Sequence, residues 1–468
     1  MTAAVRAAAP PPADTVVPLY AARQHIYQKE VQGPWQRRRA VALFVLAGYF
    51  LAQPWLQWHG RQAVWFDLPA RHFHLYGLTF WPQDFIFLSW LLIIAAFSLF
   101  FFTALAGRLW CGYACPQTVW TKFFMWIEWL TEGDRNARIR LDRSPWRAAK
   151  LGRKLAKHGS WALLAAVVAV TFVGYFSPIR ELVPRLAAWQ LSGWETFFVV
   201  ACAAALYLDA GWMREQVCKY ACPYARFQGA MFDRDTLTIF YDRGRGEPRG
   251  HRARGADAGA AGLGDCIDCN LCVHVCPTGI DIRNGTQYEC IGCAACIDAC
   301  DGVMADMGTA KGLVRYATER GLHTGRTRIT RPRLVAYGVV LAVMASTFAW
   351  ALAQRVPLRV DVLHDRARLY RTATDGRIEN PYTLKIMNLD QAERAFRVTA
   401  AGLDGLTLTA PAEVRVGPGA MADVAVQVQV PPAALSATSL PIEFTIAAVD
   451  DPSVAVVEAS RFLSPARR

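Results

Sequence analysis

The chain has 468 residues, of which 53% are hydrophobic, and it carries a formal net charge of +13. Its length leaves room for two or three domains, and its composition favours a membrane protein over a soluble one. The distribution of the charge argues against nucleic-acid binding, because the segment after Pro357 holds twelve Lys and Arg against thirteen Asp and Glu. The basic excess therefore belongs to the apolar part of the chain.

Residues 1–38 form a predicted cytoplasmic N-terminal tail. The first twenty residues are rich in Ala and Pro and contain no continuous apolar stretch, so we interpret them as flexible and not as a cleaved signal peptide. The apolar stretch that follows the tail is expected to direct membrane insertion.

Five stretches are apolar and long enough to cross a bilayer, and Trp and Tyr lie near their ends. A buried helix of a soluble protein is the alternative for any one of them. The fourth carries Asp209 near its end, where an ionisable group is costly unless it faces protein or water. We assign 39–242 to transmembrane helices 1–4 and 334–354 to helix 5. The predicted spans are 41–58, 85–106, 161–179, 196–212 and 334–352.

Basic residues alternate between the loops in a way that predicts the orientation of the chain. Arg37, Arg38 and Arg39 precede the first span, and the loop 107–160 is rich in Arg and Lys. The loops 59–84 and 180–195 carry only two basic residues each. The positive-inside rule then places the N-terminus, the loop 107–160 and the segment 213–333 in the cytoplasm, and the carboxy-terminal region outside.

Two similar cysteine motifs follow the second and fourth spans: CGYACPQ, residues 111–117, and CKYACPY, residues 218–224. In a continuous helix, the i, i+4 spacing would put both sulfurs of a pair on one face, with Cβ atoms about 5–6 Å apart. The proline after each pair is expected to bend the backbone. Thiolates select soft metals, above all Cu(I), along with zinc and iron–sulfur clusters, so Cys111, Cys115, Cys218 and Cys222 are candidate ligands for a soft metal. Two chance pairs of buried interfacial cysteines are the alternative.

Eight further cysteines repeat the C-x2-C-x2-C-x3-C spacing of bacterial two-cluster ferredoxins within a predicted domain at 266–310. Three closely spaced thiols reach three corners of one iron–sulfur cube, and the fourth thiol of each run serves the other cube, which predicts two [4Fe-4S] clusters. Zinc would need only four ligands per site, and a reducing cytoplasm disfavours disulfides. The predicted ligands are Cys266, Cys269, Cys272 and Cys300 for cluster 1, and Cys290, Cys293, Cys296 and Cys276 for cluster 2.

The segments on either side of this domain are interpreted as connections. Residues 243–265 are rich in Gly, Ala and Arg and predict a flexible linker that tethers the domain beneath the membrane. Residues 311–333 form a basic connector to the last span.

Several other potential metal ligands have simpler explanations. Cys202 lies alone within the fourth span and is interpreted as an apolar packing residue. Met125 is a potential thioether ligand, although a position on the apolar surface explains it better. His72 and His74 form an external pair of potential copper ligands, and no pattern requires His274 as a ligand.

Residues 356–468 form a predicted periplasmic domain of another kind. Apolar and polar residues alternate, as at 424–430, and turns rich in Gly, Pro and Asp recur at intervals of roughly ten residues. This pattern predicts an antiparallel β-sandwich of immunoglobulin type. The expected fold class is a multidomain membrane protein with an α-helical bundle of about five transmembrane helices, a cytoplasmic two-cluster ferredoxin-like α+β domain and a C-terminal all-β immunoglobulin-like sandwich.

These motifs, together with CPYARFQGAMFDRDT, YDRGRGEPRG and YAARQHIYQKEVQGPWQRRR, resemble the cytochrome c oxidase accessory proteins of the FixG/RdxA/CcoG group. The likeness covers nearly the whole chain. It implies a bacterial inner-membrane protein that reduces Cu(II) to Cu(I) for assembly of the copper centre of cbb3-type cytochrome c oxidase. It also implies that the two C-x3-C-P pairs, Cys111, Cys115, Cys218 and Cys222, are the catalytic copper site and that the clusters are the electron source.

Three functions are compatible with the sequence. The first is the cupric reductase, embedded in the lipid bilayer, with a copper chaperone or a cytochrome oxidase assembly factor as partner. The second is a membrane electron relay to a quinone or respiratory partner without a copper site. The third is a non-enzymatic assembly scaffold. The electron donor is unknown, and the sequence is compatible with a homo-oligomer.

Overall fold

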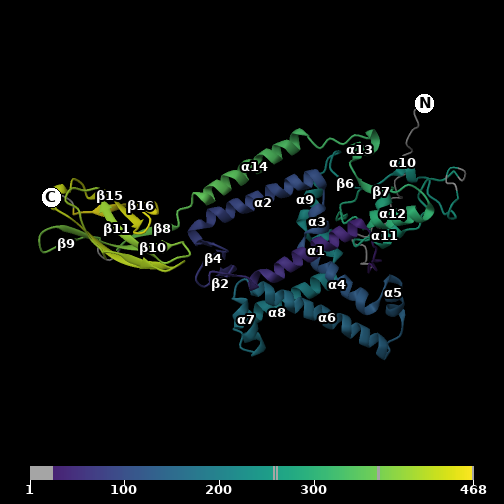
Figure 1. Cartoon of the computed structure of the whole chain (residues 1–468), viewed down its shortest axis with the longest axis horizontal. Coiled ribbons are helices and arrows are strands. Elements are labelled where there is room, and N and C mark those ends of the chain that lie inside the picture. Colours follow the sequence, from purple (N-terminus) through teal and green to yellow (C-terminus); the bar gives the residue numbers. More distant parts are fainter. Residues whose placement is uncertain (1–24, 257–258, 260–261, 366–368, 466–468) are drawn as a thin grey trace, which may run out of the picture.

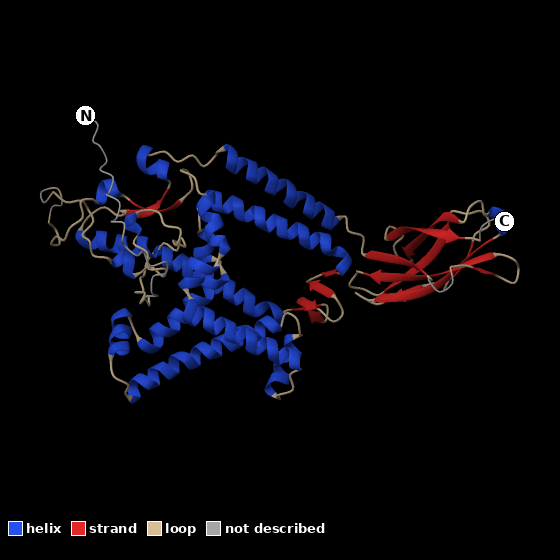
Figure 2. Ribbon diagram, turned by 180° about the vertical axis from the view of Figure 1, so that it is seen from behind, coloured by secondary structure: helices blue, strands red, loops and turns tan. Residues whose placement is uncertain are grey.

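The computed structural model describes residues 25–256, 259, 262–365 and 369–465. Within this part of the chain, long helices lie between a Cys-rich unit, residues 238–317, and a β-domain, residues 358–463 (Figure 1). Viewed from behind, long strands are confined to the β-domain, and helices make up most of the remainder (Figure 2). The Cys-rich unit and the β-domain thus lie at opposite ends of the long helices.

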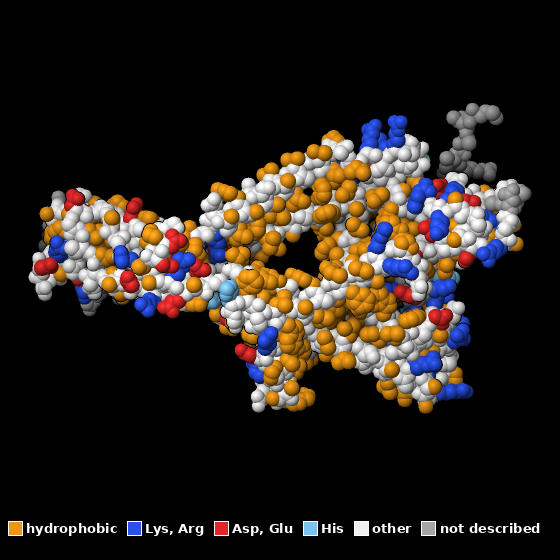
Figure 3. Space-filling view, in the orientation of Figure 1, with side chains coloured by type: hydrophobic (Ala, Val, Ile, Leu, Met, Phe, Trp, Pro, Cys, Tyr) orange, Lys and Arg blue, Asp and Glu red, His pale blue; other side chains and the backbone are white. Residues whose placement is uncertain are grey.

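In the described part of the chain, four helices are long and apolar enough to cross a membrane, and they overlap the second to fifth predicted spans. The bounds of the third, 161–179, are wrong, because its helix runs from Ala148 to Val173. Hydrophobic side chains cover much of the visible surface of these helices, whereas charged side chains gather on the β-domain and around the Cys-rich unit (Figure 3). The chain is therefore a membrane-associated protein. The four helices are α2 (Phe85–Ala106), α6 (Ala148–Val173), α8 (Gly193–Leu208), which continues into the π-helical turn η3 (Asp209–Met213), and α14 (Pro332–Ala353).

The first predicted span, 41–58, has the wrong bounds. Its helix, α1 (Pro34–Ala52), begins earlier and gives way to the 3₁₀ turn Gln53–Trp55 and then to strand β1 (Gln57–Trp58). Pro54 cannot continue the helical hydrogen-bond pattern. Only the part after Arg39 is apolar, and it is about 20 Å long at 1.5 Å per residue. That is shorter than the hydrocarbon core of about 30 Å, and α1 is not among the four long apolar helices of the described chain.

The helices form two groups, with α2 against α14 in one and α6 against α8 and α4 in the other (Figure 1). Phe124, Trp161 and Ala210 make a buried apolar contact within the second group, and the Trp161 indole donates to the carbonyl oxygen of Phe124 at 3.0 Å. The shorter helices are α3 (Leu109–Tyr113), α4 (Pro116–Glu132), α5 (Arg135–Arg143), α7 (Ile179–Ala187), the π-helical turn η4 (Val217–Ala221) and α9 (Pro223–Met231).

The β-domain is a sandwich of two antiparallel sheets, as the alternating pattern predicts. One sheet has the order β12-β14-β10-β8, with β9 also on β10, and the other has the order β13-β11-β15-β16. Tyr382, Phe396, Phe444 and Phe462 fill the space between them. The strands are β8 (Leu358–His364), β9 (Arg371–Thr372), β10 (Ile378–Asn388), β11 (Arg394–Ala401), β12 (Thr407–Thr409), β13 (Val414–Val416), β14 (Met421–Val430), β15 (Ser439–Ala448) and β16 (Ala455–Leu463).

A small ribbon between α1 and α2 supports the β-domain. Asp84, which is buried, pairs with Arg355 and lies 3.4 Å from Arg359. Trp81 packs on Met387 of β10. These contacts fix the β-domain on the end of α2. The remaining ribbon strands are β2 (Arg61–Gln62), β3 (Val64–Asp67), β4 (His72–Leu75) and β5 (Leu78–Phe80).

The Cys-rich unit extends beyond the predicted domain 266–310 on both sides. Strands β6 (Thr238–Tyr241) and β7 (Val314–Ala317) pair antiparallel and close it. The predicted connector 311–333 therefore begins with a strand of the unit. Its helices are α10 (Arg243–Gly246), α11 (Leu271–His274) and α12 (Ala295–Met307), and α13 (Glu319–Thr324) follows.

The prediction of a flexible linker at 243–265 is wrong for the part that the structure describes. The Gly250 amide donates to the carbonyl oxygen of Cys266 at 3.1 Å, and the Gly264 amide donates to that of Pro248 at 2.8 Å. Arg245 pairs with Asp265. The Gly- and Arg-rich composition thus reflects a tightly folded loop, whose glycines allow close backbone approach.

Residues 25–33 are likewise not a free tail. The Gln28 side chain, which is 4% exposed, donates to the carbonyl oxygen of Val275 at 2.7 Å, and the Lys29 amide donates to that of His274 at 2.8 Å. The Asp298 carboxylate accepts from the Gln36 amide at 2.7 Å at the start of α1. The Cys-rich unit is therefore held against α1 and not tethered loosely, while residues 1–24 of the predicted tail lie outside the described chain.

Candidate redox and metal site

The two C-x3-C-P motifs share one local structure. Cys111 lies in α3 and Cys218 lies in η4. The second cysteine of each pair, Cys115 or Cys222, has extended backbone angles and occupies the N-cap position of the next helix. Each motif is therefore a short helical turn that its second cysteine joins to a new helix.

The condition for the i, i+4 arrangement, a helix that continues through each pair, is not met. A residue before proline is pushed toward the extended region, and proline suits the first position of a helix because an amide there needs no intrahelical partner. Cys115 has φ −61° and ψ 127°, and Cys222 has φ −79° and ψ 108°. The predicted bend at the prolines is confirmed, but the two cysteines of a pair belong to different helical segments.

The structure brings the two motifs together. The thiols of Cys115, Cys218 and Cys222 are all close enough to Cys111 for their charges to act on it. The Tyr224 hydroxyl is likewise influenced by thiols of both motifs. The Cys111 thiol donates to the Gln228 side chain of α9 at 3.1 Å. Four thiols from two distant parts of the sequence therefore share one region, which we call the thiol quartet.

Burial keeps two members of the quartet protonated at neutral pH. It raises the pKa of Cys111 to about 12 and that of Cys218 to about 11. In the described part of the chain, no three His, Cys, Asp or Glu side chains are arranged to hold a single metal ion. A metal ion at the quartet would therefore require side-chain rotation and the release of thiol protons.

The two iron–sulfur runs begin with the same loop conformation. The residues on either side of the second cysteine have positive φ in both runs: Asp268 (53°) and Asn270 (56°) in the first, Gly292 (66°) and Ala294 (60°) in the second. Asp, Asn and Gly tolerate this region, whereas for other L-residues it costs roughly 1–2 kcal/mol. The left-handed residues turn each loop twice and wrap its three cysteines around one cavity.

The eight cysteines of these runs line two neighbouring cavities with otherwise largely apolar walls. One cavity holds the set predicted for cluster 1, and the other holds the set predicted for cluster 2 together with Cys272. Four sulfur donors in a dry cavity are the ligand type that a [4Fe-4S] cluster requires. The residues present thus fit the cofactor, and the assignment of individual ligands stays a prediction.

Most of these thiols are shielded from water. Burial raises the pKa of Cys272, Cys290 and Cys300 to about 12, so the free thiols are protonated at neutral pH and iron must displace the protons. Cys269 differs, because it is exposed. The first cavity therefore lies closer to the surface than the second.

The first motif touches the loop of the second cavity directly. A Cβ added to Gly112 would lie 2.8 Å from the carbonyl oxygen of Ile291 and 3.1 Å from the Cys293 amide nitrogen. The Cys111 side chain packs on the apolar cluster that contains Cys293. The carbonyl oxygen of Gly112 accepts from the guanidinium of Arg39 at 2.9 Å. Only a glycine permits this approach of two backbones, and Lys219 occupies the equivalent position of the second motif.

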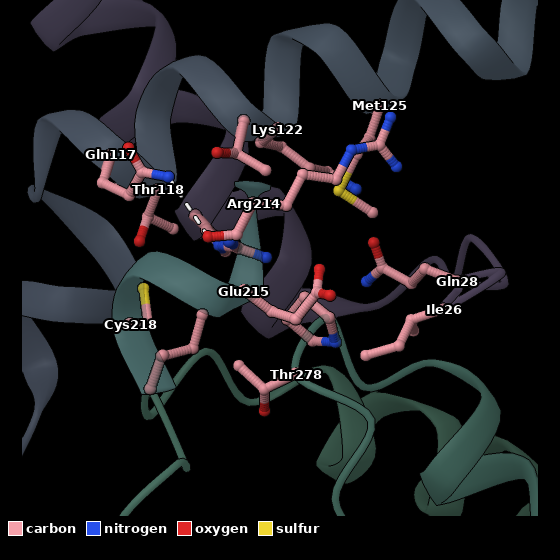
Figure 4. A pocket seen from close by; sticks show the side chains of 14 residues that line it. Ile26, Gln28, Gln117, Thr118, Lys122, Met125, Arg214, Glu215, Cys218 and Thr278 are labelled. Carbon is pink, nitrogen blue, oxygen red and sulfur yellow. Dashed lines mark hydrogen bonds between the residues drawn. The ribbon is translucent and has the colours of Figure 1, made fainter. Parts of the chain in front are cut away.

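Cys218 faces a cavity between α4 and the Cys-rich unit (Figure 4). Cys218 lies at one end of it and the thioether of Met125 lies toward the other, with Glu215 between them and Thr278 on the side of the Cys-rich unit. The second motif thus borders an opening, whereas the first borders the cluster loop. Met125 lines this cavity, and its interpretation as part of the apolar surface stays a prediction.

The remaining candidates do not join the quartet. The His74 ring lies 3.0 Å from the Thr79 hydroxyl inside the β-ribbon, and burial lowers the pKa of His74 to about 4. His72 stacks near Trp81 with ring centroids 4.0 Å apart. Cys202 is partly buried in α8, and His274 ends α11. The partners of His72 and His74 give both rings a packing role.

Sequence reasoning missed the residues that hold the Cys-rich unit in place. Gln28 and Gln36 are polar residues outside any motif, and Gln36 donates to the carbonyl oxygen of Cys293 at 2.8 Å. Asp298 lies between Cys296 and Cys300, where the spacing points only to the cysteines. Gly112 was visible only as a variable position within the motif. The one available signal was the segment 20–39, which contributed to the family resemblance.

Comparisons with known proteins agree with this architecture. A family model described as a 4Fe-4S dicluster domain matches residues 213–319, a 4Fe-4S binding domain matches 87–133, and the IG-like fold at the C-terminal of FixG matches 348–465. The nitrogen fixation protein FixG of Rhizobium meliloti is 37% identical over 428 residues, which are 84% of this chain and 82% of the relative. The chain belongs to the FixG/RdxA/CcoG group.

Two further members of the FixG/RdxA/CcoG group come from Cereibacter sphaeroides. Protein RdxA is 41% identical over 83% of this chain and 85% of its own length, and protein RdxB is 38% identical over 84% and 85%. Together with the 4Fe-4S domain matches, membership in the FixG/RdxA/CcoG group makes the chain a membrane-associated iron–sulfur electron-transfer protein.

Proposed function

We propose that this protein reduces Cu(II) to Cu(I) at the thiol quartet, for assembly of the copper centre of a cbb3-type cytochrome c oxidase. The observation that carries the proposal is the meeting of two thiol pairs beside the loop of the second cluster cavity. Thiolates prefer Cu(I), so the ligands that receive the substrate also stabilise the product.

The residues of the chain have defined tasks in this reaction. When bound, the two clusters supply single electrons at low potential, with plant-type ferredoxins near about −400 mV as a guide. One electron converts one Cu(II) into one Cu(I). Each buried thiol that binds copper releases one proton, since burial holds Cys111 and Cys218 in the protonated form. Gln228 accepts the Cys111 hydrogen bond and orients that thiol before copper binds.

We place the quartet and the Cys-rich unit in the cytoplasm of a bacterial inner membrane, and the β-domain in the periplasm. The excess of Arg and Lys in 107–160 supports this orientation. The position of the two soluble parts at opposite ends of the long helices is consistent with it (Figure 1). A copper chaperone or an oxidase assembly factor is the proposed acceptor of Cu(I).

The decisive experiment replaces all four quartet cysteines with serine in the full chain. The wild type is expected to bind copper, and its reduced clusters should be reoxidised when Cu(II) is added. The four-serine variant should keep its iron and its cluster absorbance but lose copper binding. Stoichiometric copper binding by that variant would show that the site is elsewhere.

A membrane electron relay without copper is the second candidate. The observation that favours it is the match of a 4Fe-4S binding domain to residues 87–133, which include Cys111 and Cys115. In this case the quartet would hold an iron–sulfur cluster of its own. The four-serine variant then loses iron relative to the wild type, and added Cu(II) causes no specific reoxidation. Iron analysis of the two proteins therefore separates the candidates.

A further inference from the structure

We propose that Arg108 is a positioning residue for electron transfer: its buried, unpaired positive charge stabilises an electron on cluster 2 and makes that cluster the one that serves the thiol quartet. The effect on cluster 2 follows from the Cys-rich unit and its surroundings alone. The direction toward the quartet rests on the copper-reduction proposal above.

Arg108 lies at the junction between the quartet and the second cavity. It is 4% exposed, and it lines one small cavity together with Cys290 and Gly292. A Cβ added to Gly292 would lie 3.2 Å from the carbonyl oxygen of Arg108. Arg108 is also the N-cap residue of α3, which carries Cys111 of the quartet. One residue therefore borders both sides of the junction.

This guanidinium has no carboxylate to neutralise it. It donates to the carbonyl oxygen of Ala225, and its Nε atom is buried without a hydrogen-bond partner. Arg39, 2% exposed, is similar, because it bonds only to the carbonyl oxygen of Gly112 and the side chain of Gln36. Neither arginine forms an ion pair with any residue in the described part of the chain. Burying such charges is costly unless an anion lies nearby.

In the first cavity, by contrast, the arginine is paired with carboxylates. This arginine, Arg283, lies 2.7 Å from a carboxylate oxygen of Asp281 and 2.5 Å from one of Asp268. Two carboxylates therefore neutralise the cation beside Cys272. Reduction adds one negative charge to a cluster, and a nearby unpaired cation in a dry site favours that charge. The asymmetry lowers the free energy of an electron in the second cavity relative to the first.

The test is a redox titration of the intact purified protein, without copper, monitored by the electron paramagnetic resonance of the reduced clusters. R108Q should keep both clusters. The equilibrium constant for reduction of one cluster should fall at least tenfold, which lowers its reduction potential by about 59 mV for one electron. The reduction potential of the other cluster should not change. R108K preserves the charge and should stay near the wild type. R331Q is the matched control, because Arg331 is buried but pairs with Asp233 at 3.1 Å, and both potentials should be unchanged.

Unmoved potentials in an iron-replete R108Q protein would overturn the proposal. So would an R108K protein that behaves like R108Q, because the hydrogen bond to Ala225 and not the charge would then be responsible. If R108Q loses iron, R108M carries the test, and unmoved potentials in an iron-replete R108M protein overturn the proposal equally. Failure of the copper proposal would appear as absent copper binding and would leave these potentials untouched.

Discussion

Replacement of Gly112 by alanine tests the contact through which, under the proposed function, electrons would reach the quartet. In an ordinary helix, alanine in place of glycine stabilises by about 0.5–1 kcal/mol. At Gly112 we expect alanine to destabilise the protein instead. The new Cβ would lie 2.8 Å from the carbonyl oxygen of Ile291 and 3.0 Å from that of Gly292, and both atoms belong to the backbone of the cluster loop.

The size of the effect follows from these distances. Backbone atoms cannot rotate away, so the motif and the loop must separate by about 0.6 Å to restore an ordinary contact of 3.4 Å. Overpacking of this kind costs about 1–3 kcal/mol. A misplacement of about 1 Å at a reaction site can lower the rate by about a hundredfold, so we expect a loss on the order of tenfold here.

The assay is stopped-flow reoxidation of chemically reduced clusters by a small excess of Cu(II). G112A should retain wild-type iron content and copper affinity while the reoxidation slows. The matched control is K219A at the equivalent position of the second motif, which should react like the wild type. A G112A protein with an unchanged rate, or a K219A protein that is slowed equally, would refute the idea that the first motif receives the electrons through this contact.

Three further predictions concern acidity and docking. Because burial raises the pKa of Cys111 and Cys218, their thiols are protonated at neutral pH. Copper affinity should therefore increase with pH by about tenfold per unit for each proton released, as measured by competition with a Cu(I) chelator. D298A removes the acceptor at the start of α1 and should cost about 1–2 kcal/mol. Cluster absorbance should then be lost at a lower temperature, whereas the exposed D306A should match the wild type. D84N breaks a buried ion pair worth about 3–5 kcal/mol, and protease cleavage between α14 and β8 should become faster.

Each of these predictions has a result that would contradict it. A copper affinity that does not change with pH would mean that the quartet thiols are not the ligands that release protons. Equal thermal stability of D298A and D306A would show that the start of α1 contributes nothing to the Cys-rich unit. Unchanged cleavage of D84N would show that the β-domain is held by other contacts.

The elements that sequence reasoning placed correctly are those whose signal is local. Four apolar stretches, the repeated cysteine loops and the alternating strands such as β14 each carry their pattern within a few consecutive residues. The prediction for the loop at 243–265 was wrong because it, too, relied on local composition. Its composition is that of a flexible linker, whereas its hydrogen bonds to Cys266 and Pro248 and the ion pair of Arg245 with Asp265 show that it is folded.

The contacts between distant segments could not be predicted in this way. The first span was extended too far because Trp55, Leu56 and Trp58 continue the apolar composition beyond Pro54, where the helix has ended. It was started too late because Arg39 resembles a flanking charge, whereas its guanidinium is buried on the carbonyl oxygen of Gly112. The sequence analysis grouped the two cysteine pairs, and Cys115, Cys218 and Cys222 all lie near Cys111. It did not predict that the cluster loop packs on Cys111, because no periodicity of the sequence encodes that contact.

The two cysteine motifs are alike in sequence but differ in what surrounds them. The first, with Gly112, lies against the loop of the second cluster cavity. The second contributes Cys218 to an open cavity (Figure 4). If the protein reduces copper as proposed, the pair beside the cluster loop would receive the electrons and the pair beside the cavity would admit the substrate. The two pairs would then have different tasks, and neither would replace the other.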